Sequence, residues 1–269
     1  TNMACIRSVI AYGQLSGGES SQADAEQAYI QPLLDDKIHM FIFVPPEMQT
    51  EEMKANCIGV SNPVFRLRRP LYGWSRSGNI WEHHLSDKLK AIVHDGKNGN
   101  DKWKSVENWP QTFWKIGSKG KVVVLTVYVD DFVLSGPGSS DEWDSIRKVI
   151  RTTDPTIIGR VLGVHHHFDK KGTIVNTEID MVDYVQQSVD LYNSTKGSDK
   201  FPLKNGVHYP WYEPTQLEID TLGQQPGVFG PKSASLLMKA LYCARMVRLD
   251  ICYTINTLSK YVTKWNALC

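Results

Sequence analysis

The sequence predicts an α+β fold built on an antiparallel sheet. Short β-branched runs and longer amphipathic stretches alternate irregularly along the chain, as strands and helices do in this class. Val122–Val127 and Phe132–Leu134 flank a short acidic turn, which is the pattern of a β-hairpin. Trp81, Leu85 and Leu89 recur at helical spacing. They predict an amphipathic helix that can cover one face of the sheet.

The other elements follow from local signals in chain order. Prolines stop two β-rich runs, at Pro45 and at Pro70, and Asp180 is placed to cap a helix. Residues 95–110 are polar and rich in Gly and Asn, which predicts a loop, and residues 194–231 lack periodicity, which predicts a linker. We therefore expect helices at 4–12, 78–96, 141–151, 181–192, 233–246 and 250–264, and strands at 38–44, 64–67, 122–127, 132–134, 157–168 and 173–178. Residues 22–29 are short and mixed in pattern.

The composition is that of an ordinary globular protein. The 269 residues are 41% hydrophobic and 22% charged, with a net charge of +1. This balance argues against a nucleic-acid-binding protein, which usually carries a positive excess. The average conceals an uneven distribution, however: residues 1–57 carry three basic and eight acidic groups, whereas 58–90 carry six and two and 232–269 carry six and one. Basic surfaces are therefore expected in the last two segments.

Several protein classes are excluded by what the chain lacks. Its five cysteines are scattered without a CxxC pair, which argues against a disulfide scaffold or a zinc site and favours a reducing compartment. The longest apolar run is too short to span a membrane, and Thr1–Gly13 has no signal-peptide layout. We expect an intracellular protein without a membrane partner. Because the chain stops on a helical pattern at Cys269, we also expect it to be part of a longer polypeptide.

Two adjacent carboxylates, Asp130 and Asp131, stand at the tip of the expected hairpin. Like charges this close repel each other, and a divalent cation with oxygen ligands, such as Mg²⁺, compensates them. Neighbouring side chains on a strand point to opposite faces, so a further carboxylate from another strand should complete the site. Asp24, at the end of a short strand pattern, is the candidate. The alternative is a solvated Asp-Asp turn without a cation.

The order of the motifs resembles that of the copia-type LTR-retrotransposon reverse transcriptases, over nearly the whole chain. The first acid stands five residues before an aromatic residue, a basic strand leads into Leu-Tyr-Gly, and a Tyr-Val-Asp-Asp box follows. The matching segments are Asp24–Tyr29, Ile38–Pro46, Phe65–Gly73, Trp81, Tyr128–Asp131, Val161–Gly163, Tyr242–Arg245 and Arg248–Ile251. The chain departs from the family pattern at Arg76–Asn79 and at Leu249.

This resemblance implies a polymerase palm, with an antiparallel sheet backed by helices, partial fingers and a helical thumb or connection segment. Residues 1–155 would form the palm with partial fingers, and 156–200 the primer-grip hairpin and the start of the thumb. Residues 201–269 would form a linker and the C-terminal helical thumb or connection segment. RNase H and integrase regions would adjoin the chain in its parent polyprotein, located in a cytoplasmic particle or the nucleus.

The activity implied is RNA-directed DNA synthesis from dNTPs, on an RNA or DNA template with a primer. Two Mg²⁺ ions, with Mn²⁺ as the alternative, would serve phosphoryl transfer. The resemblance assigns metal binding and catalysis to Asp24, Asp130 and Asp131, with the backbone carbonyl of Ala25 as a further ligand. It assigns substrate binding to Tyr29 as a gate against the 2′-hydroxyl, and to Ser77, Gly78 and Tyr128. Nucleic-acid contacts fall to Arg66, Arg68, Arg69, Leu162 and Gly163.

Other interpretations stay open at this point. The chain could be a catalytically inactive retroelement remnant that keeps the fold and binds nucleic acid, or a palm-type cyclase that works without a template. His165–His167 invites a metal site, although alternate side chains on a strand face opposite ways. Trp103, Trp109 and Trp114 could stack on bases, but packing within the protein explains them as well.

Overall fold

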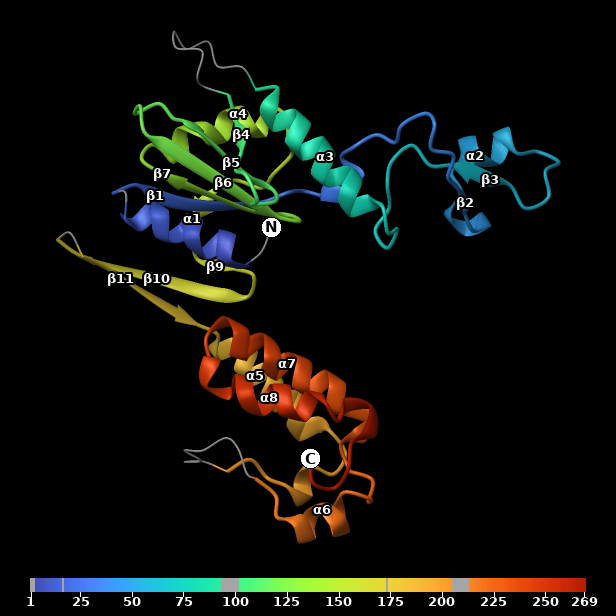
Figure 1. Cartoon of the computed structure of the whole chain (residues 1–269). Helices are drawn as coiled ribbons and strands as arrows, with labels where there is room; N and C mark the ends of the chain where they lie inside the picture. Colours follow the sequence, from blue (N-terminus) through green and yellow to red (C-terminus); the bar gives the residue numbers. More distant parts are fainter. Residues whose placement is uncertain (1–2, 16, 93–101, 173, 205–212) are drawn as a thin grey trace. The chain divides into compact units, whose positions relative to one another are not determined.

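A computed structural model describes residues 3–15, 17–92, 102–172, 174–204 and 213–269 (Figure 1). The chain forms two compact units, Thr1–Ile158 and Gly159–Cys269. The fold mixes helices and strands.

The N-terminal unit is built on a six-stranded antiparallel sheet with the order β4-β5-β6-β7-β1-β8. The central strand β7 pairs with β6 through a tight hairpin and with β1 from the start of the chain. The sheet therefore brings residues more than a hundred positions apart into register. Its strands are β1 (Glu19–Asp24), β4 (Lys104–Ser105), β5 (Thr112–Ile116), β6 (Val122–Tyr128), β7 (Asp131–Gly136) and β8 (Thr156–Ile157).

Helices cover both faces of this sheet. Figure 1 shows α3 (Ser77–Lys90) and α4 (Trp143–Arg147) on one face and α1 (Met3–Leu15) on the other. From α3, the side chains of Trp81, Leu85 and Leu89 are at most 1% exposed and pack into the main core. Because both faces are covered, the central strands carry apolar residues without a polar alternation.

Polar groups inside the sheet have partners. The hydroxyls of Thr112 and Thr126 lie 3.0 Å apart across β5 and β6. Lys115 Nζ of β5 lies 2.7 Å from Glu142 Oε2, and both side chains are almost fully buried. A buried ion pair of this kind is tolerated only when each charge is compensated by the other.

A separate two-stranded ribbon lies between β1 and α3 in the sequence. In it β2 (Phe41–Phe43) pairs with β3 (Val64–Arg66), and α2 (Glu51–Asn56) stands in the connection. Thr50 caps α2 by accepting a hydrogen bond from Met53 N at 3.2 Å. Their ladder has three residue pairs, so both strands are shorter than the sequence pattern predicts.

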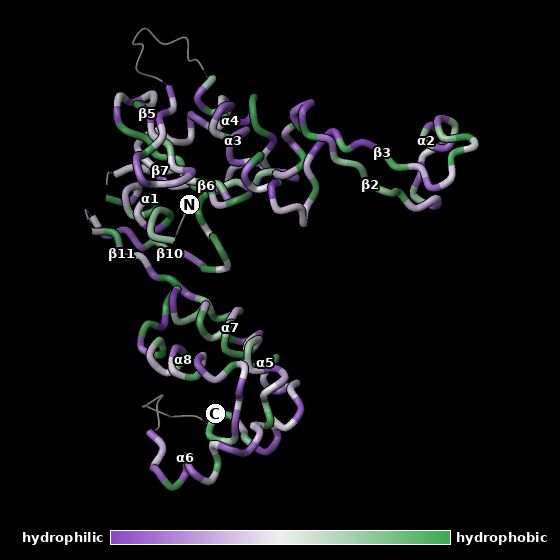
Figure 2. The backbone as a smooth tube through the Cα atoms, turned by 45° about the vertical axis from the view of Figure 1, so that its right-hand side comes forward, coloured by the Kyte–Doolittle hydropathy of each residue, from purple (hydrophilic) through white to green (hydrophobic). Residues whose placement is uncertain are grey.

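The C-terminal unit combines a three-stranded sheet, in the order β11-β10-β9, with helices. Figure 2 shows hydrophobic and hydrophilic residues mixed along α7 and α8, as expected of helices with one buried side. The elements are β9 (Arg160–Val161), β10 (Val164–Lys171), β11 (Ile174–Asp180), α5 (Val182–Ser194), α6 (Gln216–Leu222), α7 (Ser233–Met246) and α8 (Cys252–Ser259).

Three expectations need correction. The run 112–116 is a central strand that was not predicted, although its β-branched and aromatic residues lie between Pro110 and Gly117. The predicted linker contains α6, whose capping box joins Thr215 and Glu218. The helix expected to reach residue 96 ends at Lys90, and residues 93–101 lie outside the described ranges.

Candidate active site

Three carboxylates lie where β1 and β6 end and β7 begins. Asp24 is the last residue of β1 and lies directly opposite Asp131, the first residue of β7. Asp131 is also paired with Tyr128 of β6, so Val129 and Asp130 form a two-residue turn. The backbone N–H of Ala25 donates to Asp130 O at 2.7 Å, which ties the end of β1 to this turn.

The electrostatics of this cluster are unfavourable without a cation. Burial, the charges of Asp130 and Asp24, and a hydrogen bond with Asp24 raise the pKa of Asp131 to about 6. Asp131 is half-buried, while Asp24 and Asp130 are exposed. Three carboxyl groups therefore share one end of the sheet, and Asp131 resists ionisation more than an ordinary aspartate does.

The donor set suits a hard divalent cation, because carboxylate oxygens are the ligands that Mg²⁺ takes. Ala25 lies next to Asp24, so its carbonyl is available from the same segment. Within the described ranges, however, no group of three or more His, Cys, Asp or Glu side chains is already arranged to hold a metal. The carboxylates are neighbours that share a hydrogen bond, and ion binding would require them to turn toward a common point.

The turn itself is strained. Val129 has a φ of 59°, in the left-handed region that β-branched residues rarely adopt. Its carbonyl accepts a hydrogen bond from Trp81 Nε1 at 2.6 Å, and that indole is almost fully buried in α3. Helix α3 thus holds the turn that carries Asp130 in a conformation that Val129 alone disfavours.

Tyr29 lies beside the carboxylates. Burial, then the charge of Asp130 and the neighbouring Tyr72 and Glu82, raise the pKa of the Tyr29 hydroxyl. The Tyr29 ring centroid is 4.9 Å from that of Tyr72, and a Cβ on Gly78 would lie 3.9 Å from the Tyr29 hydroxyl. The first turn of α3 therefore approaches Tyr29 at ordinary contact distance.

The other residues predicted to bind substrate differ in accessibility. Tyr128 is exposed at the end of β6, next to the turn. Ser77 is buried, and its hydroxyl donates to Leu71 O at 2.6 Å. Since this bond links Leu71 to the start of α3, the contact that Ser77 makes is structural.

The three arginines of the basic run contact the loop at residues 30–36. Arg66 Nη2 donates to Asp36 O at 2.8 Å, and Arg68 Nη1 lies 3.6 Å from Asp36 Oδ1. Arg69 Nη1 donates to two backbone carbonyls, of Ile30 at 2.9 Å and of Gln31. Arg68 is the most accessible of the two ion-paired arginines, with a side chain 73% exposed.

Leu162 and Gly163 belong to the C-terminal unit. They form the two-residue turn between β9 and β10, with φ values of 50° and 73°. A tight hairpin turn of this kind favours glycine at its second position. The Tyr242 hydroxyl of α7 donates to Leu162 O, so the turn is anchored to the helices of its own unit.

The histidine run and the buried tryptophan have local partners. His167 Nε2 lies 2.7 Å from Asp180 Oδ2, and His165 Nε2 lies 3.6 Å from Asp183 Oδ2. Trp103 is 2% exposed, which favours the packing interpretation for that residue. The described part of the chain contains no metal-binding group at the histidines.

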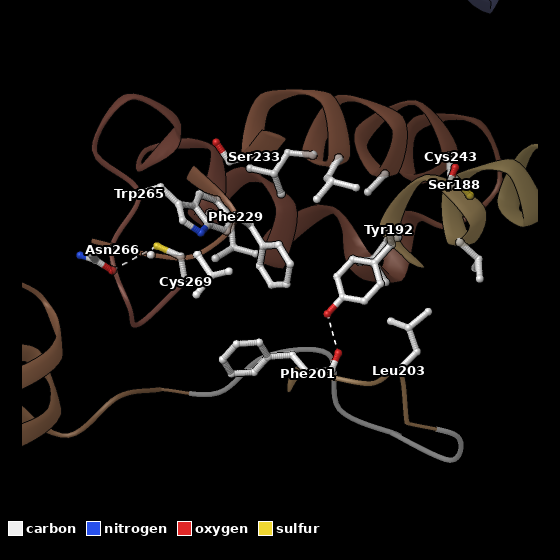
Figure 3. A pocket seen from close by; sticks show the side chains of 18 of the residues that line it. Ser188, Tyr192, Phe201, Leu203, Phe229, Ser233, Cys243, Trp265, Asn266 and Cys269 are labelled. Atoms are coloured by element: carbon white, nitrogen blue, oxygen red, sulfur yellow. Dashed lines mark hydrogen bonds between the residues drawn. The ribbon is translucent and has the colours of Figure 1, made fainter. Parts of the chain in front are cut away.

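A concave site of another kind lies in the C-terminal unit. Side chains from α5, α7, α8 and the chain end line an apolar cavity of about 580 Å³ (Figure 3). Its polar groups bond within the chain: Tyr192 donates to Phe201 O at 2.6 Å, and Cys269 Sγ lies 3.3 Å from Asn266 Oδ1. No Asp or Glu is among its described lining residues. This cavity therefore lacks the groups that phosphoryl transfer needs.

Sequence reasoning missed three residues that support the site. Trp81 is recognisable as a helix residue, but its bond to Val129 O depends on the tertiary fold. Tyr72, within the Leu-Tyr-Gly motif, contacts Tyr29. Gln31 fixes the segment around Tyr29 through bonds to Glu26 O and Arg151 O. Nothing in the sequence indicates this role except that Gln31 stands two positions after Tyr29.

Comparison with known proteins indicates the origin of the chain. It is 23% identical over 255 residues to the transposon Ty5-1 protein of Saccharomyces cerevisiae, an alignment that covers 91% of this chain and 70% of that protein. It is 24% identical over 255 residues to the transposon Ty1-DR4 Gag-Pol polyprotein of the same yeast, which covers 90% of this chain. The chain is of retrotransposon origin.

The chain spans only 14% of the length of that Gag-Pol polyprotein. No protein-family model matches it, and no solved structure does. Among the described residues, no helix has both the length and the apolar character that a membrane crossing requires.

Proposed function

We propose that this chain is the palm and thumb portion of a retrotransposon reverse transcriptase, an RNA-directed DNA polymerase. The observation that carries the proposal is the strand register. It places Asp24 opposite Asp131, with Asp130 in the adjoining turn. The Gag-Pol polyprotein relatives support the assignment, because their name denotes the polyprotein in which a retrotransposon polymerase is expected.

Each residue has a role in this mechanism. Asp24 and Asp130, with support from Asp131 and the Ala25 carbonyl, would hold two Mg²⁺ ions. When bound, such ions lower the pKa of the primer 3′-hydroxyl and neutralise the triphosphate. Burial first, and then the charges of Asp130 and Asp24, raise the pKa of Asp131. The ions would relieve the part of this shift that comes from charge repulsion. Tyr29 and Tyr72 would border the sugar of the incoming dNTP, with Gly78 leaving room beside Tyr29.

Recognition of the template and primer would rest on charge. Arg68, the exposed arginine of the basic run, is placed to contact backbone phosphates, which supply affinity without sequence preference. In the C-terminal unit, the turn at Leu162 and Gly163 would contact the primer. The adjacent RNase H and integrase regions would belong to the same polyprotein.

Primer extension tests the proposal. The polyprotein fragment that includes this chain is assayed with an RNA template, a DNA primer, dNTPs and Mg²⁺, and then with Mn²⁺. We expect Asp24→Asn and Asp130→Asn to reduce extension by about 10²-fold or more, the scale of losing one preorganised electrostatic contact. Asp144→Asn, at an exposed position on α4, serves as the matched control and should extend like the wild type.

The outcomes separate the alternatives. Salt-sensitive binding of a primer-template without extension by the wild type would identify an inactive remnant instead. Turnover of ATP or GTP without a template would identify a cyclase. Equal extension of the primer by the wild type and by Asp130→Asn would show that the carboxylate cluster is not needed for catalysis.

A further inference from the structure

Arg69 contacts the backbone immediately after Tyr29. One nitrogen of its guanidinium, Nη1, donates to the carbonyls of Ile30 and Gln31. These contacts connect the basic run before α3 to the segment that starts at Asp24. Arg69 and Gln31 are thirty-eight positions apart in the sequence. The Arg69 side chain, which the sequence predicts to contact phosphate, therefore makes hydrogen bonds within the protein.

The same segment is fixed from its other side by Gln31. Its Nε2 donates to Glu26 O at 2.8 Å and to Arg151 O at 2.9 Å, and its Oε1 accepts from Arg151 N at 3.0 Å. The amide thus pairs with the backbone of Arg151 as a neighbouring strand residue would. Arg69 thus binds the backbone carbonyl of Gln31. The side chain of Gln31 binds the carbonyl of Glu26 and so closes the loop from Glu26 to Gln31.

This support acts on a backbone that would not hold its shape unaided. Gln27 has a φ of 53°, in the left-handed region, two residues before Tyr29. The Tyr29 ring contacts Tyr72, and a Cβ on Gly78 of α3 would lie 3.9 Å from the Tyr29 hydroxyl. A shift of the Ile30 carbonyl would therefore move the ring relative to Asp130, whose charge already acts on the Tyr29 hydroxyl.

We propose that Arg69 is a positioning residue for Tyr29, and that it sets the preference for a deoxyribose over a ribose in the incoming nucleotide. This inference rests on the proposed polymerase function. The chemistry favours arginine because its planar guanidinium carries fixed donors, whereas a lysine ammonium is a flexible point charge. A phosphate contact can be made by either cation, whereas the contact with two fixed carbonyls depends on the reach and the planar geometry of the guanidinium.

The neighbouring arginine provides a matched control. Arg68 carries the same charge one position earlier, is 73% exposed, and lies 3.6 Å from Asp36 Oδ1. Arg68→Ala removes one positive charge without touching the Tyr29 segment. Arg69→Lys keeps the charge and removes the guanidinium, while Arg69→Ala removes both.

The experiment measures two quantities for each variant in the full polymerase fragment. The first is single-nucleotide incorporation of a dNTP and of the matching rNTP, and the second is primer-template affinity across a salt series. We expect Arg69→Lys and Arg69→Ala to lower the dNTP preference by about tenfold, the size of a modest misplacement, without changing the salt slope. Arg68→Ala should keep the preference and reduce the salt slope by about 1.

A third measurement does not depend on activity. With 3-fluorotyrosine at position 29, the ¹⁹F signal should shift in both Arg69 variants and stay unchanged in Arg68→Ala. If Arg69→Ala lowers the salt slope as Arg68→Ala does, while Arg69→Lys retains wild-type sugar preference and ¹⁹F shift, Arg69 is a phosphate contact and the inference is overturned. If the wild type extends no primer but the ¹⁹F shifts occur, the positioning role stands and the proposed function fails.

Discussion

Each of the two units contains an antiparallel strand pair with an aspartate at the end of a strand, and the two surroundings shift the pKa of that aspartate in opposite directions. On β1 and β7, Asp24 faces Asp131, and the pKa of Asp131 is raised to about 6. On β10 and β11, Asp180 faces His165 and bonds to His167 at 2.7 Å, and that bond is the main cause that lowers the pKa of Asp180. A carboxylate at the end of a strand thus has a repelling partner in one unit and an attracting histidine in the other.

This difference separates structural charge from functional charge. Like charges directly opposite each other on a sheet destabilise it, so the Asp24–Asp131 pair has no structural benefit. The adjoining turn adds a second cost in Val129, with its φ of 59°. Unfavourable features gathered at one point indicate a site shaped for a ligand, whereas the histidine pair is explained by local stability.

The largest effect is expected when the support of the strained turn is removed. Trp81→Phe keeps an aromatic ring in the core and removes the donor to Val129 O. We expect the free energy of unfolding to fall by about 2 kcal/mol, from the lost hydrogen bond and the smaller ring. Urea denaturation measures the loss, and primer extension should fall with it because Asp130 is in the turn.

The matched control for this change is Trp103→Phe. Trp103 is also buried, and no hydrogen-bond partner is recorded for its Nε1 within the described residues. The two variants lose the same atoms, so a larger loss in Trp81→Phe isolates the bond to Val129. Equal losses would show that the bond does not hold the turn.

The turn illustrates what the sequence can and cannot predict. The hairpin, the long helix at Trp81 and the three carboxylates follow from periodicity and local chemistry. The positive φ of Val129 and the bond from Trp81 do not, because they arise only when α3 packs on the sheet. In the same way, Arg69 carries the sequence signature of a phosphate contact, and only the folded chain shows its bonds to Ile30 and Gln31.

Asp131→Asn is expected to raise the free energy of unfolding, by less than Trp81→Phe lowers it. The folded state binds a proton on Asp131 more tightly than the unfolded state does, so this group makes the protein less stable as pH rises from about 4 to about 6. Removing the charge should raise the free energy of unfolding at pH 7 by about 1 kcal/mol, once solvent screening of this half-exposed group is allowed for.

The pH series checks the sign of that effect. The advantage of Asp131→Asn over the wild type should shrink as the pH falls to about 4 and disappear below that, where Asp131 is protonated in both the folded and the unfolded state. Asp144→Asn, at an exposed position, should follow the wild type at every pH. An advantage that persists unchanged at pH 4 would mean that charge repulsion is not its source.

The smallest effect is expected at the attracting pair, where His167→Ala removes the partner of Asp180. The folded-state pKa of Asp180 lies below its ordinary value, so its stabilisation is present above the unfolded pKa and is lost as pH falls through the folded one. A ¹³C titration of the Asp180 carboxyl should show its pKa rising toward the ordinary range in His167→Ala. His166→Ala alters a side chain on the other face of β10 and should leave that titration unchanged. If both variants shifted the pKa of Asp180 equally, the bond from His167 would not be its cause, and the contrast between the two strand pairs would rest on the repelling pair alone.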